Sequence, residues 1–134
     1  MRLALLLIPL ALAACDMPIY QASVDYELSP EHARCLKAAA NVDPAVNDCN
    51  DAELTRQDAA LNAAYAATLG ALPPEQKPKL VEAERRWIAW RNADCAWRRV
   101  GDGALDRQME MQCLIRLTRE RVEGVRVSFL QREN

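Results

Sequence analysis

The apolar residues of this chain recur every three or four positions, the spacing of one face of an α-helix. Nowhere do they alternate with polar residues as they would in a half-buried strand. The longest stripe consists of Val46, Cys49, Leu54, Leu61, Tyr65 and Leu69. A later stripe consists of Leu114, Leu117, Val122, Val125 and Phe129. The sequence therefore predicts an all-α fold, a small bundle with one short and three long helices.

Capping residues and prolines predict where the first two helices begin and end. Ser29, followed by proline and glutamate, is typical of a helix start, so a short helix is expected over residues 30–40. The segment after it breaks this helix, and Asp43 is expected to cap the next one. That second helix is predicted to run over residues 44–69, with Gly70 as its stop.

A pair of prolines, Pro73 and Pro74, predicts a turn before the third helix, which is expected over about residues 75–99. Pro78 must then lie in its first turn or kink the helix. The buried line of this helix is expected to be Leu80, Ala83 or Glu84, Trp87, Trp90 or Arg91, and Cys95. A glycine-rich turn ends it, and the fourth helix is expected over residues 105–130.

The first fifteen residues predict export. Arg2 is followed by an apolar run too short to span a bilayer comfortably, which is typical of a signal peptide. The run closes with Leu-Ala-Ala and Cys15, which resembles the lipobox of bacterial lipoproteins; the alternative is an ordinary secretory signal with a chance cysteine. The expected organisation is a lipoprotein signal peptide over residues 1–14, a lipid-anchored tether over 15–28 and a helical domain over 29–134.

The lipid on Cys15 would hold the protein on the periplasmic side of the cell envelope. Asp16 directly after it resembles the signal that keeps lipoproteins of enteric bacteria in the inner membrane, so the inner membrane is one expected location and the outer membrane the other. Nothing after Cys15 is long and apolar enough to cross a membrane, so the acyl chains would be the only anchor.

Length and charge narrow the class of protein further. About 120 residues remain after the signal, enough for one compact domain. With 17 basic and 19 acidic residues, the chain has a net charge of −2, and no basic patch suits nucleic acid.

The four cysteines after Cys15 are an even number in an oxidising compartment, so two disulfides are expected. Four cysteines allow three pairings. We favour the two local closures, Cys35 with Cys49 and Cys95 with Cys113, each contributing about 3 kcal/mol in the chain-entropy description. The alternative, a four-cysteine zinc site, needs closely spaced pairs that this sequence lacks, so neither a metal nor another cofactor is expected.

Polar residues interrupt the apolar stripes at helical spacing. Buried polar groups need partners, so we infer that Asp58 pairs with Arg91, with Arg121 or with both, and that Asn62 and Tyr65 complete the network. The expected network contains Asp58, Asn62, Tyr65, Arg91, Thr118 and Arg121. A structural role is the main interpretation, and a functional polar site is the alternative.

In order along the chain, these motifs resemble the LprI-like lysozyme-inhibitor N-terminal domain family over roughly residues 35–125. The motifs are Cys35 and Cys49, Asp58-x-x-Leu61-Asn62-x-x-Tyr65, Trp87-Ile88-x-x-Arg91-x-x-x-Cys95, and Cys113-x-x-x-Leu117-Thr118-x-x-Arg121. The family consists of small exported or lipid-anchored bacterial proteins that are described as helical. The resemblance implies a helical domain with local disulfides and, less directly, lysozyme inhibition.

The inventory of catalytic groups is thin, and an enzyme is not expected. His32 is the only histidine and is interpreted as a solvated surface residue near a helix start. Glu82 and Glu84 are flanked by arginines and are interpreted as a solvated helix face. The cysteines are expected to be oxidised, and residues 101–103 are best interpreted as a turn.

Two segments are candidate contact surfaces for a partner. Acidic residues early in the second helix could meet a basic rim, and the disulfide-closed segment 96–112 could plug a cleft with an arginine near catalytic acids. The candidate residues are Asp48, Asp51, Glu53, Arg98, Arg99 and Asp102. The competing interpretation of both segments is an exposed face and a plain connector.

Three hypotheses of function follow. The first is a lipid-anchored binding protein that inhibits lysozyme. The second is a periplasmic interaction module for another envelope protein, with no effect on lysozyme. The third is a binder of soluble substrates, which requires an apolar pocket among the helices.

Overall fold

A computed structural model describes residues 28–130 of the chain. It contains the helices α1 (Pro30–Ala39), α2 (Asp43–Ala71), α3 (Lys77–Ala96) and α4 (Ala104–Leu130), and no strand occurs within the described range. The predicted all-α fold with one short and three long helices is confirmed. The signal peptide, Cys15, Asp16, most of the tether and the Phe129 side chain lie outside what the structure describes.

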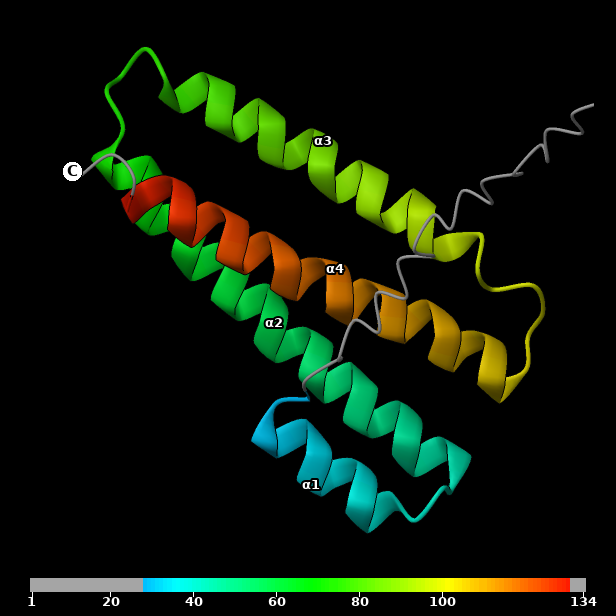
Figure 1. Cartoon of the computed structure of the whole chain (residues 1–134). Coiled ribbons are helices and arrows are strands. Elements are labelled where there is room, and N and C mark those ends of the chain that lie inside the picture. The colour runs from blue at the N-terminus through cyan, green and yellow to red at the C-terminus, as the bar shows by residue number, and fades with distance from the viewer. Residues whose placement is uncertain (1–27, 131–134) are drawn as a thin grey trace, which may run out of the picture.

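The helices are arranged in the order α1, α2, α4, α3 across the molecule (Figure 1). Helices α2 and α4 run in the same direction and form the most extensive interface, while α3 runs back along α4. The short α1 runs back along the first half of α2. The centre of the fold is therefore the α2–α4 pair, with one helix on each outer side.

The connection between α1 and α2 corrects the predicted cap. Asp43 is not the cap but the first residue of α2, and the cap position belongs to Val42, whose carbonyl accepts from the amide of Val46 at 2.9 Å. Ala40 and Asn41 take left-handed conformations with φ of 48° and 64°, which brings Val42 into position. The carboxylate of Asp43 accepts instead from Gln108 of α4 at 3.1 Å.

The end of α2 also differs from the prediction. Gly70 does not stop the helix, because α2 continues to Ala71 and no glycine in the described chain has a positive φ. Leu72 is extended, with ψ of 143°, since the residue before a proline disfavours helical angles. Pro73 therefore ends this helix.

Helix α3 begins two residues later than expected and ends at Ala96, with Pro78 in its first turn as predicted. Two further turn hydrogen bonds, from Arg98 to Cys95 and from Arg99 to Ala96, follow its end. Helix α4 begins one residue before the predicted position.

The core includes two apolar clusters between α2, α3 and α4. Leu61, Val122 and Val125 form one, and Cys95, Cys113 and Leu117 form the other. Trp87 packs against both clusters and so joins them. Each fully buried aliphatic side chain contributes about 1.5–3 kcal/mol, so these few residues provide much of the driving force for packing.

The open alternatives on α3 are decided by the structure. Glu84 and Arg91 are buried, whereas Ala83 and Trp90 are exposed. Of the predicted α2 stripe, Cys49 and Leu61 are buried and the other members only partly so. Polar side chains thus occupy core positions on α3, and as buried polar groups they require hydrogen-bond partners on the neighbouring helices.

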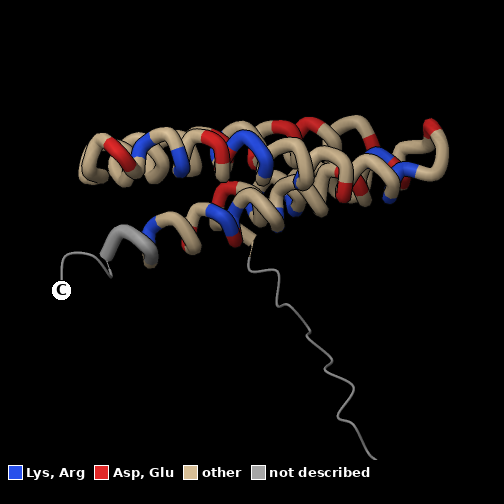
Figure 2. The backbone as a smooth tube through the Cα atoms, turned by 90° about the horizontal axis from the view of Figure 1, so that it is seen from above, with Lys and Arg blue, Asp and Glu red and all other residues tan. Residues whose placement is uncertain are grey.

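Acidic and basic positions are interleaved along the helices, without a large region of one sign (Figure 2). Within the described residues, none of the helices combines the length and the apolar character needed to cross a bilayer.

Candidate functional site

Two disulfides fix the outer helices to the central pair. Cys35–Cys49 joins α1 to the start of α2, and Cys95–Cys113 joins the end of α3 to α4. This is the predicted local pairing. Each bond closes a short loop, so it lowers the conformational entropy of the unfolded chain. In the folded protein it holds the segment between its cysteines in place.

Arg91 of α3 is the centre of the first polar network. Its Nη1 donates to Asp58 Oδ1 at 2.8 Å and to Thr118 Oγ1 at 2.7 Å, so one guanidinium connects α2, α3 and α4. The Thr118 hydroxyl donates in turn to the Leu114 carbonyl at 2.7 Å. Arg91 has 10% of its side chain exposed and Asp58 has 43%, so the pair lies at the edge of the core.

Arg121 does not share this network but forms a second one. Its Nε and Nη2 donate to the same Glu84 oxygen at 3.0 and 2.8 Å. Glu84 is therefore buried against α4, and its interpretation as a solvated face is wrong. The Trp87 ring lies between the two networks, 5.3 Å from the Arg91 guanidinium and 5.5 Å from that of Arg121. The i, i+3, i+7 spacing of Glu84, Trp87 and Arg91 is the sequence signal that could have revealed this face.

Asn62 and Tyr65 do not complete the network as predicted. Asn62 is exposed and Tyr65 is partly buried, and among the described residues no hydrogen bond joins either side chain to Arg91 or Asp58. The reason is the rotation of about 100° per helical residue. Since Leu61 faces α4, its neighbour Asn62 is turned toward solvent.

A third polar network joins α1 to α2, and the sequence analysis missed it. His32 is 1% exposed and its Nε2 lies 2.9 Å from Asn50 Oδ1, so its interpretation as a surface residue is wrong. Glu53, a candidate contact for a partner, is 2% exposed and accepts from Ser29 at 2.8 Å and Gln57 at 2.8 Å. The serine that caps α1 thus also ties the helix start to α2.

The pKa of Glu53 reflects this surrounding. Burial raises the pKa of the carboxyl, but hydrogen bonds from Gln57, Ser29 and Arg56 outweigh burial, so the pKa lies below its ordinary value. Glu53 is thus a structural carboxylate, unavailable to a partner.

The disulfide-closed segment 96–112 consists of the loop at the end of the bundle where α3 meets α4, together with the start of α4 (Figure 1). Its arginines have acidic neighbours: Arg98 donates to Asp94 at 3.2 Å, and Arg99 lies 3.3 Å from Asp102 and 3.7 Å from Glu110. The arginine charges in this segment are therefore largely balanced within the chain.

The disulfide-closed segment exposes apolar side chains to solvent. Trp97 is 66% exposed, Val100 89% and Leu105 69%. The other predicted contact surface is smaller than expected, because Asp51 binds Arg107 of α4 at 2.8 Å and only Asp48 of the proposed acids stays fully on the surface.

The groups that could bind a metal have another role. Asp94, Cys95 and Cys113 place three potential ligand atoms within 4.8 Å of one another. Both cysteines share a disulfide, however, and a metal site needs thiolates. The donor set therefore does not fit a metal ion.

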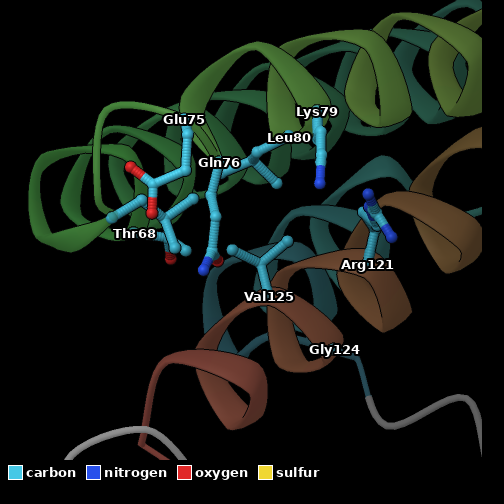
Figure 3. A pocket seen from close by; sticks show the side chains of 9 residues that line it. Thr68, Glu75, Gln76, Lys79, Leu80, Arg121, Gly124 and Val125 are labelled. Carbon is cyan, nitrogen blue, oxygen red and sulfur yellow. The ribbon is translucent and has the colours of Figure 1, made fainter.

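Among the depressions in the described surface, two have volumes of about 500 Å³ each and lie between helices. One lies between the end of α2, the start of α3 and α4 (Figure 3). There Lys79 and Arg121 lie close together at one end and Glu75 at the other, with Leu80 and Val125 between them. The second depression lies between α1, α2, α4 and the end of α3.

A family profile described as "Lysozyme inhibitor LprI" matches residues 35–124 of the chain. The matched segment starts at the first disulfide cysteine and includes both disulfides and the networks of Arg91 and Arg121. No curated protein and no solved structure matches the chain.

Proposed function

Because this chain belongs to the LprI lysozyme-inhibitor family, we propose that it is an exported, lipid-anchored binding protein that inhibits a lysozyme at the cell envelope. The family profile supports the inhibitor part of this proposal, since it covers most of the domain. Action by binding rather than catalysis agrees with the site, where the single histidine is buried and the cysteines are oxidised.

The membrane anchor is part of the same proposal. Its support is the signal-like segment that ends at Cys15, and the even number of cysteines after it, all four of which are paired. Disulfides persist in oxidising compartments, which agrees with a location on the periplasmic side. An acyl mass on the first residue of the mature protein, found by mass spectrometry, is the expected result.

The surface proposed to contact lysozyme is the disulfide-closed segment. The sequence suggested an arginine as the group entering the cleft, but Arg98 and Arg99 are occupied by Asp94, Asp102 and Glu110. Trp97 and Val100 are better anchors, because exposed aromatic and apolar side chains on a rigid support dominate binding energy. The Cys95–Cys113 bond lowers the entropy that the segment loses on binding.

The test is a titration of purified mature protein into a lysozyme that digests a suspension of bacterial cell walls. We expect lysis to slow at micromolar protein. Trp97→Ala should raise the concentration for half-inhibition by at least about tenfold. Trp90→Ala is the matched control, because Trp90 is also exposed and lies on α3 outside the closed segment.

The lysozyme titration and the two tryptophan variants test the function and the contact surface separately. Undiminished lysis at micromolar excess of the wild-type protein would remove inhibition for the lysozyme tested and favour an interaction module for another envelope protein. Equal losses in the two tryptophan variants would refute the closed segment as the contact surface.

A further inference from the structure

The second depression has features of a binding site that inhibition of lysozyme does not use. Leu36 of α1, Val46 of α2 and Met109 of α4 provide apolar walls, and Arg98 and Arg116 provide two guanidinium groups. None of the described residues that line it is acidic. Each arginine has one acidic partner, Asp94 or Glu120, but neither of these acids lines the cavity, so the charged groups that face a bound molecule are basic and favour an anionic ligand.

Buried donors without acceptors point in the same direction. Asn50 is 1% exposed and its Oδ1 is engaged by His32, while its Nδ2 has no hydrogen-bond partner within the described chain. The buried Nε of Arg98 also has none there. Burying a donor without an acceptor costs about 1–3 kcal/mol, so a ligand that supplies acceptor oxygens would recover this loss.

Both arginines retain donors for such a ligand. Arg98 uses Nη2 for Asp94, and Arg116 uses Nη1 for Glu120 at 2.7 Å. Each partner lies four residues away in the sequence, and both guanidiniums stay partly exposed. A carboxylate accepts hydrogen bonds from guanidinium groups in a strong, directional geometry.

We propose that this cavity binds a small carboxylic acid with a short apolar chain. The carboxylate lies between Arg98 and Arg116 and within reach of the Asn50 amide, and the chain packs on Leu36, Val46 and Met109. The volume of about 500 Å³ suits a ligand of this size. The depression of Figure 3 fits this ligand less well, because Glu75 lies in it and would repel a carboxylate.

Isothermal titration calorimetry with octanoate tests the proposal on the oxidised protein. We expect saturable binding with a Kd of about 1 mM or tighter, from the affinity per atom that small ligands reach. Octanamide has the same chain without the charge and should bind at least about tenfold more weakly. A second arm compares acetyl-Leu-Leu with its C-terminal amide, which separates a free acid from a peptide end as the source of the carboxylate.

Variants locate the site. Arg116→Gln should weaken octanoate at least about fivefold, and Asn50→Asp should abolish binding by adding a negative charge to the cavity. Arg126→Gln is the matched control, because Arg126 is another α4 arginine with one glutamate partner, Glu123 at 3.2 Å, and lies outside the cavity. Lys79→Gln reports on the other depression.

Equal binding of octanoate and octanamide, or no saturable binding, would overturn the proposal. Loss of binding in Lys79→Gln with full binding in Arg116→Gln would also overturn it, since the acid would then occupy the wrong cavity. Circular dichroism of each variant shows whether it is folded. The result is independent of the lysozyme assay, because none of these substitutions changes Trp97 or Val100.

Discussion

Replacing Glu53 by alanine should destabilise the domain strongly, because this carboxylate is almost completely buried and holds α1 on α2. It accepts from Ser29 at 2.8 Å, from Gln57 at 2.8 Å and from Arg56 at 2.6 Å. Hydrogen bonds to a charged group contribute about 1.5–3 kcal/mol each. The Arg56 bond counts for less, about 0–1 kcal/mol, since 41% of that side chain is exposed.

We take the lower end of that range for the bonds from Ser29 and Gln57 and add a small contribution from Arg56. Glu53→Ala should then lower the free energy of unfolding by about 3–4 kcal/mol. For a domain of this size, that loss lowers the melting temperature by roughly 10–20 °C. Urea denaturation followed by circular dichroism measures the free energy of unfolding directly. The matched control is Glu31→Ala, which removes an exposed glutamate at the start of α1 and should lower the melting temperature far less than Glu53→Ala.

The pH dependence gives a second measurement of the same carboxylate. Its folded pKa is lowered from the ordinary 4.5, so the stabilisation is present above that pH and is lost as the pH falls through the folded pKa. Glu53→Gln cannot titrate, so its stability deficit relative to wild type should be constant above about pH 5.5 and shrink below pH 4.5. A deficit that stays flat or grows on acidification, or equal stability of Glu53→Ala and Glu31→Ala, would refute this reasoning.

Further substitutions test the other contacts. In urea denaturation, Arg91→Ala should lower the free energy of unfolding by about 3 kcal/mol and Asp58→Ala by only about 1 kcal/mol. The difference is expected because Asp58 is partly exposed and Arg91 keeps its bond to Thr118 without it. Equal losses in the two variants would contradict this reasoning. Replacing Cys95 and Cys113 together by serine should lower the free energy of unfolding by about 3 kcal/mol, checked against the reduced wild type. Ala40→Gly should raise stability by about 0.5 kcal/mol, since Ala40 has a φ of 48°, and a lower melting temperature would contradict this.

The fold class and the disulfide pairing were within reach of the sequence. Apolar residues at helical spacing, together with Pro30, Pro44 and the Pro73–Pro74 turn, act locally, so they determine where helices form without reference to the rest of the chain. The disulfides followed because short loops favour local closure. The Asp58–Arg91 pairing was also anticipated, since both residues lie on faces that point inward.

Only the tertiary structure decided which partner each buried charge takes. Arg91 on α3 and Arg121 on α4 both interrupt apolar stripes, yet Arg91 binds Asp58 of α2 and Arg121 binds Glu84 of α3, a choice that depends on how the three helices pack against one another. His32 and Glu53 are buried because α1 packs against the first half of α2. The spacing of residues in a helix determines on which side of the helix each side chain lies. Burial depends on which other helix covers that side, and this is set by the packing of all the helices.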